Sequence, residues 1–164
     1  MASQTLKNKY CFDSSVFIDG WRRNYPFEMF QPLWENVGEG IINGRVLVPH
    51  EVKKEILSGT DELVKWFKRY NAYIIPISIE QINIVRKIVN QYQAVSQYKK
   101  PRPNHADPFV VAVAELENCI VVTYETPNGS DQNPAIPDLC RERGIPWLSF
   151  IELFKQEGWK FNIM

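Results

Sequence analysis

The chain has 164 residues, of which 45% are hydrophobic and 13% are aromatic. These values are typical of one globular domain with a sizeable core, and we expect residues 1–164 to form it. Lysine and arginine total 19, and aspartate and glutamate also total 19, so the formal net charge is zero. Overall charge therefore gives no indication of nucleic-acid or membrane binding.

The cysteines are three in number and contain no CxxC pair: Cys11, Cys119 and Cys140. They indicate neither a disulfide framework nor a zinc site, and two of them lie in apolar runs that are typical of buried free thiols. The first nine residues lack the apolar core of a signal peptide, and no apolar run approaches the roughly 20 residues of a membrane-spanning helix. We therefore expect a cytoplasmic protein without membrane association.

The first half of the chain alternates short apolar runs with segments that space apolar residues three and four apart, so strands alternate with helices. In chain order we expect a strand at 9–13, a helix or turn at 14–23, a helix at 29–42, a strand at 44–49, helices at 50–59 and 60–70, and a strand at 72–78. Pro76 places the last of these strands near an edge of the sheet.

The second half continues the alternation. We expect a helix at 79–98, a basic and proline-rich loop at 99–107, a helix at 108–118, a strand at 119–125, a polar loop at 126–134, a helix at 135–144, a strand at 145–150 and a helix at 151–158. The run 119–125 is apolar almost throughout, as expected of a strand covered on both faces. The order predicts an α/β fold: a three-layer α/β/α sandwich whose mostly parallel sheet has about four to five strands.

Carboxylates lie where the predicted strands end or where the adjoining helices begin. They are Asp13 after the first strand, Glu51 and Glu55 in the helix after the second, Asp107 at the start of the helix that precedes the fourth strand, and Glu125 and Asp131 after that strand. In parallel sheets the functional site lies outside the carboxyl ends of the strands. Acids gathered there repel one another unless cations are bound, and oxygen donors favour Mg²⁺ or Mn²⁺. Such ions polarise a phosphoryl oxygen and activate water, so the natural substrate is a phosphodiester.

Each acid also has a structural explanation. Asp107 before Pro108 is a good helix N-cap, and Asp13 could cap the helix that follows it. The glutamate pair could form a solvated helix face, and the two acids after the fourth strand could be ordinary loop residues. Acids at four strand-end positions of one predicted sheet favour a shared site.

Four segments carry a resemblance to a known family: YCFDSSVFID, VPHEVKKEILSG, ADPFVVAVAEL, and IVVTYE with GIPWLSF after it. In this order they resemble the PIN-domain superfamily of metal-dependent nucleases, which includes the VapC-type toxins. The resemblance covers nearly the whole chain and selects Asp13, Glu55 and Asp107. The fourth acid of the family is usually aspartate, whereas here Glu125 holds that place and Asp131 competes with it. Glu51 is an additional acid.

The resemblance implies a Mg²⁺- or Mn²⁺-dependent endoribonuclease, selective for single-stranded or structured RNA. Catalysis and metal binding would fall to Asp13, Glu55, Asp107 and Glu125, with Glu51 and Asp131 as further candidates. The hydroxyls of Ser14, Ser15 and Thr123 could bind the carboxylates or the substrate phosphate, or cap helices. RNA phosphates would meet Lys99, Lys100 and Arg102, and Trp21, Tyr98 or Tyr124 could stack on an unpaired base. The resemblance is also compatible with a toxin that has an antitoxin partner, and with a homodimer.

Two other functions compete with this interpretation. A PIN-like module without catalysis, which binds RNA or protein, is favoured by Glu125, by the zero net charge and by the many aromatic residues. A phosphatase that uses Asp13 as a nucleophile is disfavoured, because position 15 is serine where the haloacid-dehalogenase-like group has its second aspartate.

Overall fold

The computed structural model describes residues 6–93, 107–130 and 133–161. Within them a four-stranded sheet has the order β2-β1-β3-β4, and every neighbouring pair is parallel. The strands are β1 (Tyr10–Phe12), β2 (Val46–Leu47), β3 (Ile120–Val122) and β4 (Trp147–Leu148). The helices are α1 (Ser14–Asp19), α2 (Gln31–Ile42), α3 (His50–Leu57), α4 (Glu62–Lys68), α5 (Ile79–Gln93), α6 (Asp107–Glu117), α7 (Ile136–Arg143) and α8 (Phe150–Glu157), with a π-helix η1 (Gly20–Asn24) and a 3₁₀ helix η2 (Asn71–Tyr73).

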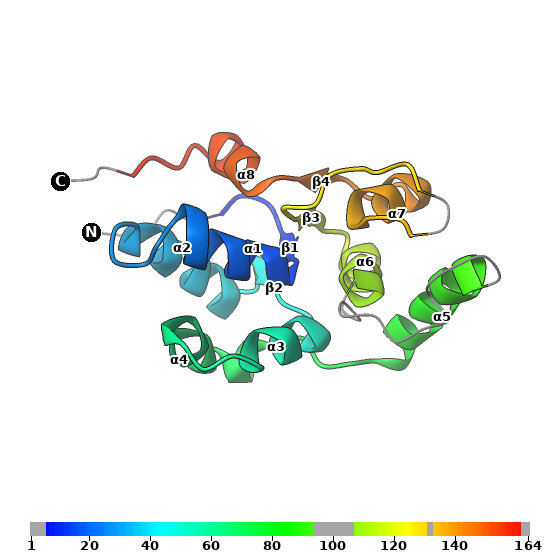
Figure 1. Cartoon of the computed structure of the whole chain (residues 1–164), viewed down its shortest axis with the longest axis horizontal. Helices are drawn as coiled ribbons and strands as arrows, with labels where there is room; N and C mark the ends of the chain where they lie inside the picture. The colour runs from blue at the N-terminus through cyan, green and yellow to red at the C-terminus, as the bar shows by residue number, and fades with distance from the viewer. Residues whose placement is uncertain (1–5, 94–106, 131–132, 162–164) are drawn as a thin grey trace.

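Helices cover both faces of this sheet. Figure 1 shows α1 and α2 on one side of the strands and α5, α6 and α7 on the other. β1 lies between β2 and β3, where Tyr10 stands opposite both Val46 and Ile120, and all three residues of β1 are buried. The predicted α/β/α sandwich with a parallel sheet is therefore confirmed, and its four strands lie within the expected number.

An aromatic cluster fills the core between β1 and the helices α1, α2 and α8. The ring of Phe12 lies 5.6 Å from that of Phe17 and 5.8 Å from that of Phe150, and Trp34 lies 5.7 Å from Phe150. All four side chains are almost fully buried. Burial of one large apolar side chain contributes about 1.5–3 kcal/mol to the free energy of folding. These rings therefore hold α1 against the core and fix the direction that the chain takes after β1.

A glycine allows α2 to lie close to β2. A Cβ atom at Gly40 would stand 2.6 Å from Cγ2 of Val46 and 2.9 Å from Cδ1 of Leu6, which is closer than real contacts allow. Gly40 is therefore the position at which α2 lies against Val46 of β2.

The strand predicted at 72–78 is wrong. Residues Asn71–Tyr73 form η2, and after them the segment makes only an isolated parallel bridge, between Ile75 and Pro49. The Ile75 N–H donates to the Val48 carbonyl at 2.9 Å, but pairing stops there. The physical reason is that Pro49 and Pro76 have no N–H and that α3 starts at His50, so the neighbouring strand turns away.

The other predicted elements are present with shifted ends. The strands are shorter than the apolar runs, and the segment 14–23 is α1 followed by η1. The helix expected at 79–98 starts at Ile79 and is followed to Gln93, whereas 94–98 and most of the basic loop lie outside the described residues.

The three cysteines are buried and free of disulfide bonds. Burial raises the pKa of Cys119 to about 11 and that of Cys140 to about 12, so both thiols stay protonated at neutral pH. In the described part of the chain, no helix is both long and apolar enough to cross a membrane.

Candidate active site

Asp13 directly follows the central strand and is held by three donors. One carboxylate oxygen, Oδ1, accepts the Ser14 backbone N–H at 2.8 Å. The other, Oδ2, accepts the hydroxyls of Ser15 at 2.7 Å and of Thr123 at 3.0 Å. Asp13 is thus both the N-cap of α1 and a buried, oriented carboxylate at the carboxyl end of the sheet.

Two further acids meet Asp13 from distant parts of the chain. Asp107 comes from the start of α6 and Glu125 from the segment after β3. One oxygen of each of the three carboxylates lies within 4.8 Å of the others. Asp13 and Asp107 are buried, and Glu125 is half-buried. We name these three residues the acidic cluster.

Glu55 approaches the acidic cluster through Ser14. Its Oε2 accepts the Ser14 hydroxyl at 2.5 Å, while the same hydroxyl lies 3.5 Å from Oδ1 of Asp13. α3 presents Glu55 to this hydroxyl because α1 and α3 pack against each other. Glu55 therefore lies one hydroxyl away from Asp13, outside the group of three.

Thr123 connects the two sides of the acidic cluster. Its hydroxyl donates to Asp13 and accepts the backbone N–H of Glu125 at 3.0 Å. The Ser15 hydroxyl makes a similar connection, because it donates to Asp13 and accepts the backbone N–H of Tyr124, the residue before Glu125, at 3.0 Å. The three hydroxyl residues expected near the carboxylates thus all lie there.

Burial raises the pKa of Asp13, although the hydrogen bonds from Ser15, Thr123 and Ser14 act in the opposite direction. A carboxylate removed from water favours its neutral form unless a cation compensates. Two more carboxylates nearby strengthen this tendency. The acidic cluster is therefore electrostatically suited to a positive ion.

The donor set fits a hard divalent cation. All three side chains offer oxygen, which Mg²⁺ and Mn²⁺ prefer. Oxygens bound to one Mg²⁺ at about 2.1 Å are about 3.0 Å apart when cis and about 4.2 Å apart when trans, so three oxygens within 4.8 Å of one another would draw closer around a bound ion. Asp13, Asp107 and Glu125 are the residues that would hold the ion, with Glu55 next to them.

Of the other candidate acids, the structure describes Glu51 and places it outside the acidic cluster. Glu51 pairs with Lys54 of its own helix at 3.5 Å and lies 3.7 Å from His50. Asp131 and the basic residues Lys99, Lys100 and Arg102 lie outside the described residues. The two arginine side chains of η1 form ion pairs with acids: Arg22 pairs with Asp61 at 2.7 Å, and Arg23 pairs with Asp19 at 3.6 Å.

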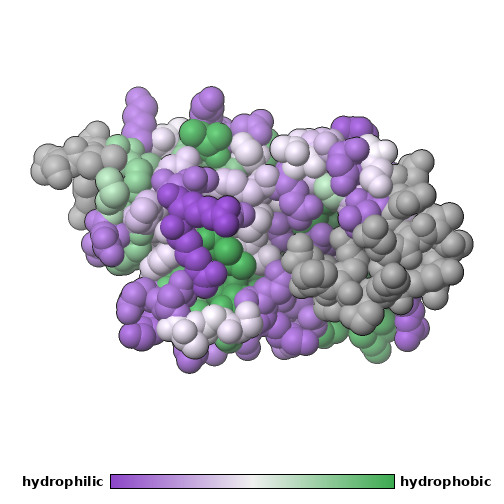
Figure 2. Space-filling view, viewed as in Figure 1, coloured by the Kyte–Doolittle hydropathy of each residue, from purple (hydrophilic) through white to green (hydrophobic). Residues whose placement is uncertain are grey.

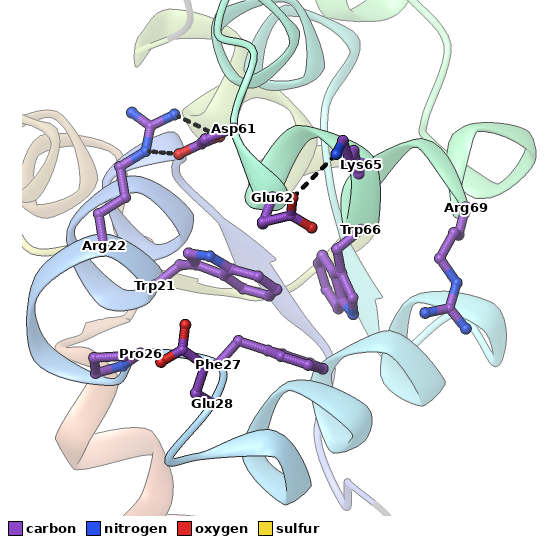
Figure 3. A pocket seen from close by; sticks show the side chains of 10 residues that line it. All are labelled: Trp21, Arg22, Pro26, Phe27, Glu28, Asp61, Glu62, Lys65, Trp66 and Arg69. Carbon is purple, nitrogen blue, oxygen red and sulfur yellow. Dashed lines mark hydrogen bonds and ion pairs between the residues drawn. The ribbon is translucent and has the colours of Figure 1, made fainter.

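A groove of about 640 Å³ lies between α4 and η1, which directly follows the end of α1. Figure 3 shows Trp21, Phe27 and Trp66 at its centre and charged side chains around them. The rings of Trp21 and Phe27 stack on each other at 4.8 Å and 20°, so the Trp21 face is occupied. Figure 2 shows hydrophobic surface between hydrophilic areas on the face of the molecule seen in Figure 1. We name the groove around Trp21, Phe27 and Trp66 the aromatic groove.

Sequence reasoning missed a contact from α7. The Ile136 backbone N–H, at the first residue of that helix, donates to Oε1 of Glu125 at 3.2 Å. The sequence AIPD has the proline and the acid of a helix start, which was the available signal. That this start faces Glu125 depends on tertiary structure.

Comparison with family models assigns the chain to a family. A family model described as a domain of unknown function, DUF4411, matches residues 10–161. No curated protein matches this chain.

Two solved structures are similar over most of the chain. One is the structure of VapBC2 from Rickettsia felis bound to a DNA fragment from its promoter, with a TM-score of 0.53 and 11% identity. The match covers 86% of this chain and 98% of the VapBC2 chain. VapBC-1 from nontypeable Haemophilus influenzae has a TM-score of 0.52 and 13% identity, and covers 87% of this chain and 98% of that one. At such identities the likeness concerns the fold. The chain therefore belongs to the DUF4411 family and has the PIN-like fold of the VapC proteins, which its sequence motifs resemble.

Proposed function

We propose that this protein is a Mg²⁺- or Mn²⁺-dependent endoribonuclease that hydrolyses phosphodiester bonds of single-stranded RNA. The observation that carries the proposal is the acidic cluster, in which three carboxylates from distant segments lie within 4.8 Å of one another at the carboxyl end of a parallel sheet. Burial of that much negative charge is costly without a cation. The PIN-like fold supports the choice of reaction.

In this proposal Asp13, Asp107 and Glu125 hold the ion, and Glu55 completes the set from the Ser14 side. When bound, Mg²⁺ or Mn²⁺ polarises a phosphoryl oxygen and lowers the pKa of water so that it can attack. The protein's own contribution is orientation. Ser15 and Thr123 fix the plane of the Asp13 carboxylate, and Ser14 fixes Glu55.

Substrate contact is proposed for Lys99, Lys100 and Arg102, which precede Asp107 in the chain. Contacts with phosphates would make RNA binding weaken as salt increases. The described cations Arg22, Arg23 and Lys54 are paired with acids, so they are poorer candidates for this role.

The test is cleavage of a labelled single-stranded RNA with Mn²⁺, with EDTA, and with variants. Asp13→Asn and Asp107→Asn are expected to abolish cleavage, because each removes a carboxylate of the acidic cluster. Asp19→Asn is the matched control: Asp19 lies in the same α1 but pairs with Arg23. Full activity of either cluster variant would refute the assignment. A protein that binds RNA but shows no heat of Mn²⁺ binding would instead be a non-catalytic PIN-like module.

We also propose a protein partner of the antitoxin type, in line with the VapBC proteins that share the fold. The aromatic groove is a suitable surface for an apolar segment of that partner. Three cations and three acids line it, namely Arg22, Lys65, Arg69, Glu28, Asp61 and Glu62. This balance of charge favours a polypeptide over RNA, which requires net positive charge.

Arg69 and Glu28 offer the charges with which such a segment would pair. Within the described residues neither takes part in an ion pair, whereas Arg22 and Lys65 pair with Asp61 and Glu62. Co-expression with a candidate antitoxin protein should give a complex whose nuclease activity is suppressed. Arg69→Glu and Glu28→Lys should weaken it, and Arg86→Glu on α5 should not. A complex unaffected by both groove variants would place the partner elsewhere.

A further inference from the structure

Glu125 is the member of the acidic cluster with the longest side chain and the only one that lies beyond its strand by several residues. β3 ends at Val122, so Glu125 is already part of the following loop. Its side chain has three rotatable bonds, and ordering it costs conformational entropy. The position of its carboxylate beside Asp13 and Asp107 therefore needs a structural cause.

The start of α7 supplies one. The Ile136 N–H donates to Oε1 of Glu125 at 3.2 Å, and the first turn of a helix attracts negative charge. The position of the carboxylate therefore depends on where the start of α7 lies relative to Glu125.

Asp138 determines that placement. Its Oδ2 accepts the backbone N–H groups of Asn128 at 3.0 Å and of Ala135 at 2.9 Å, and its Oδ1 accepts that of Gly129 at 3.1 Å. One side chain on α7 thereby joins the middle of the segment between β3 and α7, at Asn128 and Gly129, to Ala135 at the start of this helix. Although partial burial acts to raise it, these three N–H groups lower the pKa of Asp138, which stays ionised.

We infer that Asp138 is a positioning residue for the metal site, which acts through the start of α7 on the carboxylate of Glu125. This inference rests on the proposed function, because it assigns to Asp138 an effect on the affinity for the divalent ion. Asp138 itself lies outside the acidic cluster and need not touch the ion. Residues that orient metal ligands from the second layer typically change metal affinity about 10–100-fold when they are substituted.

The experiment measures Mn²⁺ binding to the full chain by calorimetry. Asp138→Asn keeps the size of the side chain but offers one acceptor oxygen in place of two, so at least one of the three N–H groups loses its partner. We expect the Mn²⁺ dissociation constant to rise about 10-fold or more. The control is Glu152→Gln, because Glu152 accepts the Ser149 N–H at 3.0 Å at the start of α8, outside the acidic cluster. Its substitution should lower thermal stability without changing Mn²⁺ affinity.

A double-mutant cycle separates positioning from general loosening. In a Glu125→Ala background, Asp138→Asn should cause no further loss of Mn²⁺ affinity, because its effect passes through Glu125. If Asp138→Asn fails to fold, Asn128→Ala loosens the same loop at an exposed position, where Asn128 accepts the Ser130 N–H at 2.8 Å. It should raise the dissociation constant by a smaller factor.

Three results would overturn the inference in different ways. Unchanged Mn²⁺ affinity in the folded Asp138→Asn and Asn128→Ala proteins would refute it alone. An equal loss in the wild-type and Glu125→Ala backgrounds would show that Asp138 does not act through Glu125. A wild-type protein that binds no Mn²⁺ would refute the proposed function and this inference together.

Discussion

The Thr123 hydroxyl offers the most direct test of how the acidic cluster is held. The side chain is fully buried after β3, and its hydroxyl both donates to Asp13 and accepts from the Glu125 backbone. Thr123→Val replaces this hydroxyl by a methyl group of similar size. Packing is retained, and the loss is confined to these two hydrogen bonds and a longer contact of 3.5 Å with the Ser15 hydroxyl.

The magnitude follows from those two bonds. A hydrogen bond to a charged group contributes about 1.5–3 kcal/mol, and a neutral one about 1 kcal/mol. Ser15 still donates to Oδ2 of Asp13 at 2.7 Å, so the carboxylate keeps a partner on that oxygen. We therefore expect Thr123→Val to lower the free energy of unfolding by about 2–4 kcal/mol.

The assay is urea unfolding followed by tryptophan fluorescence, with the midpoint compared at constant m-value. Thr123→Ser is the control, because it keeps the hydroxyl and loses one buried methyl group, at a cost of about 1 kcal/mol. The valine variant should also bind Mn²⁺ more weakly than the serine variant. Equal midpoints for the two variants would refute the role given to the hydroxyl.

Three further predictions concern packing, a long-range bond and pH. Gly40→Ala should destabilise the protein by about 1–3 kcal/mol in urea unfolding, despite the better helix propensity of alanine, because the Cβ would meet Val46 at 2.6 Å; a stabilised variant would contradict this. Tyr10→Phe removes the 2.6 Å bond to Glu157 and should cost about 1.5–3 kcal/mol in thermal unfolding, so a melting temperature equal to that of the wild type would argue against it. Because burial raises the pKa of Asp13, its carboxyl group stays protonated to a higher pH in the native protein than in the unfolded chain. The stability of the metal-free protein should therefore fall as pH rises from about 4 through the native pKa of Asp13. Asp13→Asn should reduce this fall when unfolding in EDTA is measured at several pH values, and an unchanged slope would show that another group causes it.

Much of the fold could be predicted because its signals are local. The apolar run that contains Tyr10–Phe12 and the one that contains Ile120–Val122 are buried parallel strands, as their composition indicates. The acids Asp13, Asp107 and Glu125 could be proposed for one site because the carboxyl ends of parallel strands meet at the same edge. Because β1 and β3 are neighbours in the sheet, Asp13 and Glu125 lie close together although they are far apart in the sequence.

The rest depended on contacts that no local pattern contains. The segment around Ile75 has the composition of a strand, but its partner turns away at α3 after one bridge. Glu51 and Glu55 have helical spacing, yet Glu55 meets the Ser14 hydroxyl whereas Glu51 pairs with Lys54. Such outcomes are decided by the neighbours of each side chain.

The central position of β1 has a consequence for the newly made chain. Asp13 is synthesised early, but the hydroxyl that holds it belongs to Thr123, 110 positions later, and the neighbouring strand β3 is equally distant. Parallel pairing over such a separation carries a large loop-closure cost, so it forms late. A growing polypeptide on the ribosome therefore lacks the assembled carboxylates until residues beyond Glu125 have emerged. Under the proposed ribonuclease function, this order of assembly would keep the growing chain inactive next to the messenger RNA that encodes it.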